Sequence, residues 1–355
     1  MKVNQLVPSY HRGDAIGDTA GHIKRFLLSQ GFASNIYCLD RDRELEDESE
    51  LFVQFPDLNE GDITLFHFAL PSPMTEAFKR LPGKKVLIYH NITPAEFFED
   101  FSEEMARITR LGRQEAASLA GHTHLGLADS EYNRLELEDF GFKKTDVFPL
   151  FVDFEKYKQP VNQFVYDLYN DERTNILFVG RIVPNKRIED LLRVVQYYKK
   201  FISPLVRLII IGKTASLPKY YEALIKFADE LFLQPDEVVF TGHIPDAEMF
   251  AYYRVSDVFL SLSEHEGFGL PFIESLVFDL PVIAYNCTAV PYTLGGAGVL
   301  VNGKDFRKLG ELVHKIAAEK ELREKIIKGQ RKRLDEFKSL DSQGKLLKHI
   351  KELSE

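Results

Sequence analysis

Short apolar runs alternate with amphipathic stretches along almost the whole chain. The runs have the length of buried strands, and the stretches between them have the spacing of helices with one apolar face. This alternation predicts an α/β protein in which a helix follows each strand of a parallel sheet. The strands that we expect are Lys2–Pro8, Ser34–Cys38, Asp62–His67, Lys85–His90, His124–Ala128, Thr145–Pro149, Asn175–Gly180, Val206–Gly212, Glu237–Gly242, Val258–Ser261 and Pro281–Tyr285. The helices that we expect between them include Thr19–Ser29, Ala95–Leu119, Arg187–Lys200, Pro218–Leu231, Ala247–Val255 and Pro271–Phe278.

The expected elements fall into two series, which are separated by Tyr157–Arg173. That segment is polar and short of aliphatic residues, so we expect an irregular linker there. The length of 355 residues also favours two domains, because single cores usually stop growing at about 250–300 residues. We predict one doubly wound domain over 1–160, a second over 173–330, and a charged helical tail over 331–355. The carboxyl ends of both sets of strands, where open α/β sheets bind ligands, would face a shared cleft.

Composition excludes several kinds of protein. The formal charge is 45 − 54 = −9, whereas nonspecific nucleic-acid binding needs a cationic surface, so we expect no nucleic-acid partner. Cys38 and Cys287 are the only cysteines, which excludes a disulfide framework and a cysteine-rich zinc site. Met1–Tyr10 lacks the apolar run of a signal peptide, and no apolar stretch of about 20 residues is present, so we expect a soluble cytoplasmic protein.

The richest chemistry lies in Ser263–Pro281, which reads SEHEGFGLPFIESLVFDLP. Gly267 and Gly269 permit unusual backbone angles and the close approach of a ligand. Pro271 suits the first turn of a helix, so the amides of the loop would converge on a helix N-terminus and favour a phosphate. Glu266 and Glu274 flank these glycines and can accept hydrogen bonds from the hydroxyls of a sugar. A glycine turn followed by a capped helix is the structural alternative.

A second segment, Phe178–Lys186, reads FVGRIVPNK and supplies cations. It is a strand that ends at Gly180 and is followed by Arg181 and Lys186. A loop with two cations can neutralise a diphosphate, which Arg would contact through its fork and Lys as a point charge. The alternative is that both cations are simply solvated at the surface. The glutamate loop expected at the same edge of the domain argues against that alternative.

Arg181 and Lys186, followed about eighty residues later by EGFGLPFIE, resemble glycosyltransferase family 4. Tyr89–Pro94 (YHNITP) and Ala128–Leu135 (ADSEYNRL) resemble segments of the acceptor domain of that family, and Gly13–Asp18 (GDAIGD) resembles its loop after the first strand. The resemblance covers nearly the whole chain. It implies a GT-B fold, which consists of two Rossmann-like domains and a C-terminal helix that crosses back to the first domain. It also implies transfer of a hexose, with retention of configuration, from a nucleoside-diphosphate sugar to an acceptor hydroxyl.

The resemblance also assigns roles to individual residues. Arg181 and Lys186 would hold the diphosphate, Glu266 the donor sugar, and Glu274 the ribose. The implied catalytic set is Arg181, Lys186, Glu266 and His90, of which His90 would contact the sugar. The implied donor-binding set is Gly17, Arg181, Lys186, His243, Ile244, Glu266, Phe268, Gly269, Leu270 and Glu274. The chain departs from the family at Asp279, where a small residue is common, and at Tyr292, where an acidic residue is frequent.

The expected chemistry needs no metal and no cofactor. Breaking the anomeric bond moves negative charge onto the nucleotide diphosphate, and fixed cations aimed at that charge stabilise the transition state. The second half has no Asp-x-Asp pair that could chelate a metal, so we expect Arg181 and Lys186 to take its place. The proton of the acceptor would pass to the leaving phosphate in a front-face attack.

Three other functions fit the sequence less well. A nicotinamide oxidoreductase should show Gly-x-Gly-x-x-Gly after its first strand, whereas this chain has SYHRGDAIGDTAG there. A noncatalytic nucleotide-sugar-binding subunit should lack a member of the motifs, whereas this chain has Arg181, Lys186, Glu266 and Glu274. A storage-glucan phosphorylase or synthase of GT-B type is a third alternative, for which the chain is short.

The sequence says less about the donor and the acceptor than about the type of reaction. The segment His243–Met249 has no lysine to address a guanine carbonyl, which favours UDP-glucose, while Glu248 keeps GDP-mannose open. The acceptor would be a carbohydrate or a lipid-linked saccharide of a cell-envelope or exopolysaccharide pathway. By analogy with the family we expect peripheral contact with the inner face of the membrane, through Lys79, Arg80, Lys84 and Lys85 or through Arg107, Arg110 and Arg113.

Overall fold

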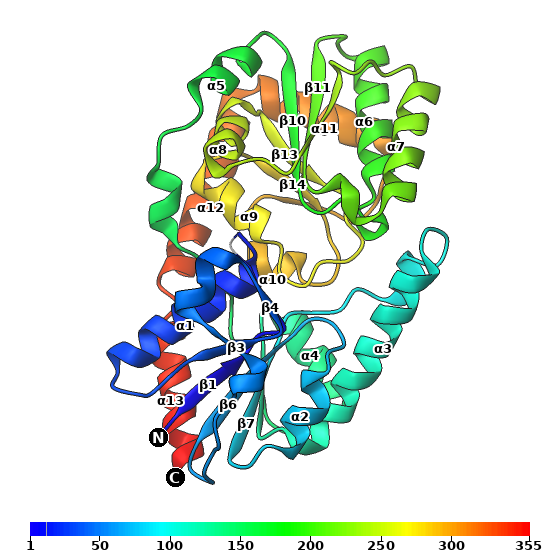
Figure 1. Cartoon of the computed structure of the whole chain (residues 1–355). Coiled ribbons are helices and arrows are strands. Elements are labelled where there is room, and N and C mark those ends of the chain that lie inside the picture. The colour runs from blue at the N-terminus through cyan, green and yellow to red at the C-terminus, as the bar shows by residue number, and fades with distance from the viewer. Residues whose placement is uncertain (12) are drawn as a thin grey trace. The chain divides into compact units, whose positions relative to one another are not determined.

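The computed structural model describes residues 1–11 and 13–355 and divides the chain into two compact units. Unit 1 comprises Met1–Glu96, Glu103–Val152 and Leu340–Glu355, and unit 2 comprises Phe97–Ser102 and Asp153–Ser339. Each unit contains its own parallel sheet with helices on both faces (Figure 1). The alternation of apolar runs and amphipathic stretches therefore folds as expected.

Unit 1 is built on a sheet with the strand order β5-β3-β1-β6-β7-β8-β9. Its strands are β1 (Val3–Leu6), β3 (Ile36–Cys38), β5 (Glu50–Leu51), β6 (Ile63–Phe68), β7 (Lys84–Tyr89), β8 (Leu125–Ala128) and β9 (Thr145–Val147). Its α-helices are α1 (Ala15–Ser29), α2 (Met74–Arg80), α3 (Glu103–Leu119), α4 (Glu131–Asp139) and α13 (Ser342–Ser354). The strand order reverses between β1 and β6, and the loops at that switch point are where this kind of sheet binds ligands.

The core of unit 1 has one layer on each face of the sheet. One layer joins residues such as Phe66, Phe68 and Phe78, and the other joins Val3, Leu65 and the helix α13. Leu346, Ile350 and Leu353 of α13 are buried there, so the C-terminal helix returns to the N-terminal unit, as expected. In Figure 1 this helix, in red, runs beside β1, and both termini lie near its end.

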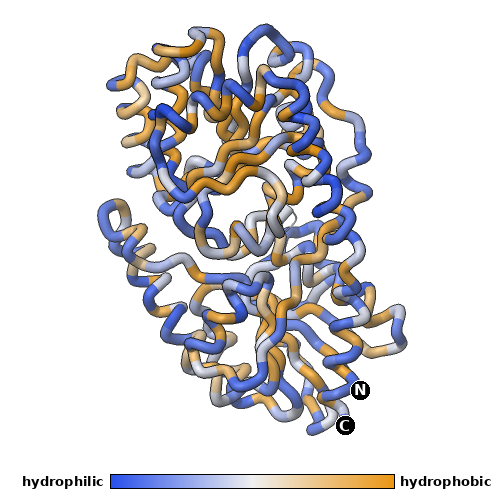
Figure 2. Tube along the Cα trace, turned by 180° about the vertical axis from the view of Figure 1, so that it is seen from behind, coloured by the Kyte–Doolittle hydropathy of each residue, from blue (hydrophilic) through white to orange (hydrophobic). Residues whose placement is uncertain are grey.

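Unit 2 is built on a sheet with the order β12-β11-β10-β13-β14-β15. Its strands are β10 (Thr174–Val179), β11 (Val206–Ile211), β12 (Val238–Gly242), β13 (Val258–Ser261), β14 (Val282–Tyr285) and β15 (Val299–Val301). Its longer helices are α6 (Ile188–Phe201), α7 (Pro218–Glu230), α8 (Asp246–Val255), α9 (Leu270–Val277), α11 (Phe306–Ala318) and α12 (Lys320–Lys338). In Figure 2, orange apolar runs pass through the middle of this unit, with blue polar segments around them.

The carboxyl edge of the sheet in unit 2 packs its backbone closely. A Cβ atom added to Gly212, after β11, would lie 1.9 Å from the carbonyl oxygen of Gly180, after β10. Only glycine therefore fits at position 212. The strand order reverses between β10 and β13, so the loops that follow these two strands lie at the switch point of this unit.

Three expectations about elements are wrong in detail. The predicted helix Ala95–Leu119 is interrupted, and α3 begins only at Glu103. Phe97 and Phe101 belong to unit 2, where they pack on His265 and Tyr220 of the same unit. The predicted irregular linker contains α5 (Gln163–Tyr169), whose first turn is capped by the side chain of Asn162. The strand β15 was not predicted, since its run of three apolar residues is shorter than a typical strand.

Candidate functional site

Two loops meet at the carboxyl edge of the sheet in unit 2. Lys186 ends the 3₁₀ turn η6 (Pro184–Lys186) after β10, and Glu266 lies in the loop after the neighbouring strand β13. The Nζ atom of Lys186 lies 2.6 Å from Oε2 of Glu266, and each side chain is 12% exposed. The structure therefore brings two of the residues expected at the active site into one half-buried ion pair.

The backbones of these two loops are joined as well. The amide of Glu264 donates to the carbonyl of Asn185 (2.8 Å), and the side-chain amide of Asn185 donates to the carbonyl of His265 (2.9 Å). Thr288 holds Glu266 from the other side, because its hydroxyl accepts from the amide of Glu266 and donates to its carbonyl, both at 2.9 Å. Glu266 is thus fixed by its main chain independently of its charge.

The glycine loop leads directly into α9. Gly269 has φ +85° and a Cβ atom there would lie 2.5 Å from the ring of Phe272, so this position requires glycine. Leu270 is the first residue of α9 and Pro271 follows it, as expected for a helix start. Phe268 is buried and packs on the ring of Phe337, and this contact anchors the loop.

Glu274 lies in α9 and is almost completely buried. Its Oε1 atom accepts from the hydroxyl of Tyr157 (3.1 Å) and its Oε2 atom from the hydroxyl of Tyr253 (2.8 Å). Burial raises the pKa of Glu274, and burial together with the nearby carboxylate raises the pKa of both tyrosines, so the tyrosines keep their protons and donate. Each carboxylate oxygen has a second lone pair, which leaves Glu274 able to accept further hydrogen bonds.

Neither tyrosine was expected beside Glu274. Tyr157 is 117 positions away along the chain and Tyr253 is 21 positions away. No spacing rule connects residues at those distances, so only the tertiary structure could reveal the contact.

The other expected donor-binding residues follow strands of the same sheet. Arg181 comes after β10 and is exposed, and among residues 1–11 and 13–355 its side chain has no hydrogen-bonding or ionic partner. His243 is exposed and Ile244 half-buried, directly after Gly242 at the end of β12. The structure does not bring Arg181 into contact with Lys186 or Glu266.

Two expected site residues, Gly17 and His90, belong to unit 1. Gly17 lies in the first turn of α1, where a Cβ atom would be 2.5 Å from the carbonyl oxygen of His11. Glycine is therefore needed for α1 to approach the preceding loop. His90 follows β7, and its side chain is only 3% exposed.

The ring of His90 is part of a buried chain of hydrogen bonds. Its Nδ1 atom lies 3.0 Å from Oδ2 of Asp129, and its Nε2 atom lies 3.0 Å from Nδ1 of His67. The Nε2 atom of His67 lies 2.9 Å from Oε1 of Gln5, whose amide nitrogen donates to the carbonyl of Ala20. Burial, and then the neighbouring His90, lower the pKa of His67 well below its ordinary value, so His67 is neutral.

These contacts assign the protons of the chain. The carbonyl of Gln5 must accept, so the proton of neutral His67 is on Nε2, and its Nδ1 accepts from Nε2–H of His90. The remaining contact, between Nδ1 of His90 and Asp129, needs a second proton. Both ring nitrogens of His90 therefore have hydrogen-bonding partners. The expected contact of His90 with a sugar stays a prediction, and in this arrangement neither ring nitrogen is free for it.

The partners of His90 could have been found from the pattern of the strands. Gln5 and His67 are polar residues inside apolar strands, β1 and β6, while His90 and Asp129 directly follow β7 and β8. These four strands are consecutive neighbours in the sheet. A polar residue in each of four adjacent strands or strand ends was the signal that the sequence analysis missed.

Within residues 1–11 and 13–355, no group of three or more His, Cys, Asp or Glu side chains is arranged to hold a metal ion. In the same residues, no helix combines the length and the apolar character needed to cross a membrane.

Sequence comparison relates the second half of the chain to known enzymes. Residues 163–333 match the family model described as glycosyl transferases group 1. The capsular polysaccharide biosynthesis glycosyltransferase CapM of Staphylococcus aureus is 33% identical over 52% of this chain and 48% of its own length. The serotype-specific mannosyltransferase WbdA of Escherichia coli is 26% identical over 43% of this chain and 18% of its own. The chain thus spans about half, or less, of these relatives' length.

Structural comparison covers the whole chain. The structure of HepE from Anabaena in complex with UDP and glucose matches with a TM-score of 0.76 and 16% identity, over 99% of this chain and 100% of that one. This likeness, with the parallel sheet in each unit, confirms the predicted GT-B architecture of two Rossmann-like α/β domains. The chain has this fold, and its residues 163–333 carry the sequence pattern of the group 1 glycosyl transferases.

Proposed function

We propose that this protein is a glycosyltransferase that moves a hexose from a nucleoside-diphosphate sugar to an acceptor hydroxyl. The observation that carries the proposal is the half-buried pair of Lys186 and Glu266, at the ligand-binding edge of a sheet whose sequence matches the group 1 family. A cation for the diphosphate and a carboxylate for the sugar hydroxyls are the two groups that such a donor needs at adjacent positions.

The proposed roles follow from the chemistry of each group. Lys186, together with the exposed Arg181, stabilises the negative charge that develops on the diphosphate when the anomeric bond breaks. Glu266 accepts hydrogen bonds from the hexose, and the backbone of Gly269 and Leu270 at the start of α9 contacts the donor. Glu274 remains the candidate for the ribose through the lone pairs that Tyr157 and Tyr253 leave available.

We further propose that the reaction retains the anomeric configuration and needs no metal. The second half of the chain has no Asp-x-Asp pair, and the two cations supply the charge that a metal would otherwise supply. Release of nucleoside diphosphate should therefore continue after exhaustive treatment with EDTA. Loss of turnover that manganese or magnesium restores would contradict metal independence.

For the donor, we favour UDP-glucose. The matching structure of HepE was determined with UDP and glucose, and His243–Met249 of this chain has no lysine for a guanine carbonyl. GDP-mannose is the alternative, which the similarity to the mannosyltransferase WbdA favours. A thermal-shift panel of UDP, GDP and their sugars decides between them, because a ligand at 100 times its Kd stabilises a protein by about 2.7 kcal/mol.

For the pathway, we propose assembly of a cell-surface polysaccharide, which the relation to CapM supports. The acceptor would be a carbohydrate or a lipid-linked saccharide, reached by peripheral contact with a membrane. Release of nucleoside diphosphate from UDP-glucose or GDP-mannose tests the enzyme activity itself. Tight nucleotide binding without any release or transfer would favour the alternative, a noncatalytic nucleotide-sugar-binding subunit.

A further inference from the structure

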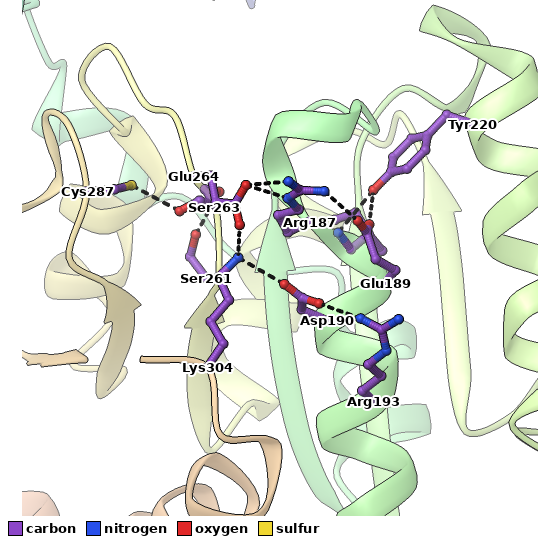
Figure 3. Close-up of polar contacts among 11 residues, drawn as sticks. Arg187, Glu189, Asp190, Arg193, Tyr220, Ser261, Ser263, Glu264, Cys287 and Lys304 are labelled. Carbon is purple, nitrogen blue, oxygen red and sulfur yellow. Dashed lines mark hydrogen bonds and ion pairs between the residues drawn. The ribbon is translucent and has the colours of Figure 1, made fainter. Parts of the chain in front are cut away.

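Arg187, Glu264 and Lys304 form a cluster of charged residues (Figure 3). Arg187 directly follows Lys186, and Glu264 lies two positions before Glu266. Arg187 directs both Nε and Nη2 to Oε2 of Glu264, each at 2.6 Å. Lys304, after β15, lies 2.7 Å from Oε1 of Glu264 and 2.9 Å from Oδ2 of Asp190 on α6. Both oxygens of Glu264 are thus occupied by cations from two different elements.

The cluster uses the same two chain segments as the proposed active site. Lys186 and Arg187 are consecutive, and they pair with Glu266 and Glu264 respectively. Asn185 joins the same segments through its carbonyl and its side-chain amide. Arg187 and Glu264 therefore determine how the loop after β10 is aligned with the loop after β13.

The cations of the cluster also give Glu264 partners of its own, so that it does not share Lys186 with Glu266. Burial raises the pKa of Glu264, but the hydrogen bonds and charges of Arg187 and Lys304 outweigh burial and lower it, so Glu264 is ionised. Without these cations, Glu264 would be an uncompensated anion two positions from Glu266. Such an anion would compete for Lys186 and repel a diphosphate.

The backbone at Arg187 is strained, and the ion pairs of its side chain offset the cost of that conformation. Arg187 has φ +51° and ψ +47°, the left-handed conformation that glycine adopts freely and other residues adopt at a cost. Its guanidinium is held by Glu264 and, at 3.3 Å, by Glu189. Glu189 in turn accepts from the hydroxyl of Tyr220. The contacts of the side chain keep an arginine where the backbone alone would favour glycine.

We infer that Arg187, Glu264 and Lys304 are positioning residues of the glycosyl transfer, which hold Lys186 and Glu266 in register for the donor. This inference rests on the proposed function and adds to it three residues that do not themselves touch the donor. Because misplacement of a catalytic group by about 1 Å can cost on the order of 100-fold in rate, the cluster should affect turnover more than folding.

The test is Arg187→Gly, a change that removes the side chain and relieves the backbone. Turnover, measured as nucleoside diphosphate released from UDP-glucose or GDP-mannose, should fall by on the order of 10- to 100-fold, while the melting temperature does not fall. Arg187→Lys, which keeps one positive charge, should recover part of the loss. Lys304→Met should lower turnover in the same way and raise the KM for the donor.

Asp279→Gly is the matched control. Asp279 also has a left-handed backbone, with φ +53°, and also forms a two-pronged ion pair, with Arg331, in the same unit. Its replacement should leave turnover and KM unchanged. A loss of turnover in Arg187→Gly but not in Asp279→Gly would therefore show that Arg187 acts by positioning Lys186 and Glu266. It would exclude a general effect of removing an ion pair from a strained turn.

Two results would overturn the inference. The first is wild-type turnover and KM in both Arg187→Gly and Lys304→Met. The second is an equal loss in Asp279→Gly. If Arg187→Gly proved too unstable to assay, Lys304→Met alone would decide in either direction. A wild-type protein that neither binds nor cleaves any nucleotide sugar would instead contradict the proposed function, so the two failures are distinguishable.

Discussion

Arg181 and Lys186 have the same proposed role but different surroundings. Arg181 is exposed, whereas Lys186 is 12% exposed and paired with Glu266. Arg181→Ala should cut turnover on the order of 100-fold and leave the free energy of unfolding within about 0.5 kcal/mol of wild type. Lys186→Ala should cut turnover as much and also lower stability, because it leaves the carboxylate of Glu266 half-buried and unpaired. Donor cleavage and chemical denaturation of both variants measure these effects, and near-wild-type turnover in either would contradict its role.

The ion pair of Lys186 and Glu266 predicts opposite effects on nucleotide binding and on turnover. A diphosphate must compete with Glu266 for Lys186, since the Nζ–Oε2 distance is only 2.6 Å. Glu266→Gln removes the competing charge, and charges a few Å apart in such a site interact by on the order of 1 kcal/mol or more. UDP or GDP alone should therefore bind about tenfold more tightly to this variant, while donor turnover falls.

Titration calorimetry with the free nucleoside diphosphate, and release assays with the donor, measure the two effects separately. Lys186→Gln is the control, since it should weaken both binding and turnover. Weaker diphosphate binding to Glu266→Gln than to wild type would show that the pair does not oppose the ligand.

At the scale of elements, α13 shows which kind of contact fixes a helix to a sheet. Its buried side chains Leu346, Ile350 and Leu353 contribute about 1.5–3 kcal/mol each when removed from water. Its polar contacts to Asp146, an ion pair from Lys345 (2.7 Å) and a hydrogen bond from His349 (2.8 Å), are partly exposed, and such contacts contribute about 1 kcal/mol or less. The apolar face therefore dominates the docking, and Ile350→Ala should destabilise unit 1 by about 2–5 kcal/mol in denaturant titrations.

The pairs to Asp146 nevertheless predict a pH dependence. Burial raises the pKa of Asp146, but the hydrogen bonds from Lys345 and His349 outweigh burial and lower it. A carboxylate with a depressed pKa in the folded state stabilises the protein above its ordinary pKa of about 3.9, and this contribution is lost as the pH falls through the folded value. The stability difference between wild type and Asp146→Asn should be largest near neutral pH and shrink below about pH 4.

Denaturation of both proteins across this range checks the sign. Lys144→Gln, which removes an exposed pair with Glu352, should give a smaller difference at every pH. A difference between wild type and Asp146→Asn that grows in acid would contradict the assignment.

The elements themselves were mostly predictable because buried parallel strands are apolar throughout and the helices between them are amphipathic. The break after Phe97 was not, because Phe97 and Phe101 belong to unit 2 and make tertiary contacts with His265 and Tyr220 of that same unit. The same holds for the site. The sequence could place Lys186 and Glu266 together, because each lies in a loop after a predicted strand and such loops meet at the edge of the sheet that binds ligands. The tyrosines at Glu274 could not, since they come from distant segments.

At the scale of the whole molecule, the formal charge of −9 opposes binding to an anionic membrane, so any docking must use a local patch. In the patch of Lys79, Arg80, Lys84 and Lys85, two of the four cations already have partners within the protein. Lys79 pairs with Glu76 at 2.6 Å, and Lys85 donates to the carbonyl of Lys79. Arg113, from the second basic stretch, pairs with Glu136 at 2.7 Å.

Arg80 and Lys84 therefore carry most of the expected membrane contact. Each cation near an anionic surface contributes about 1 kcal/mol, so these two give a reversible attraction on the order of 30-fold. Binding to vesicles should require anionic lipid, fade as salt is added, and disappear in the double variant Arg80→Gln and Lys84→Gln. The matched variant, Lys79→Gln and Lys85→Gln, should keep most of the binding because those side chains already have partners. Equal recovery of wild type in the supernatant with neutral and anionic vesicles at low salt would contradict docking through this patch and favour a soluble acceptor.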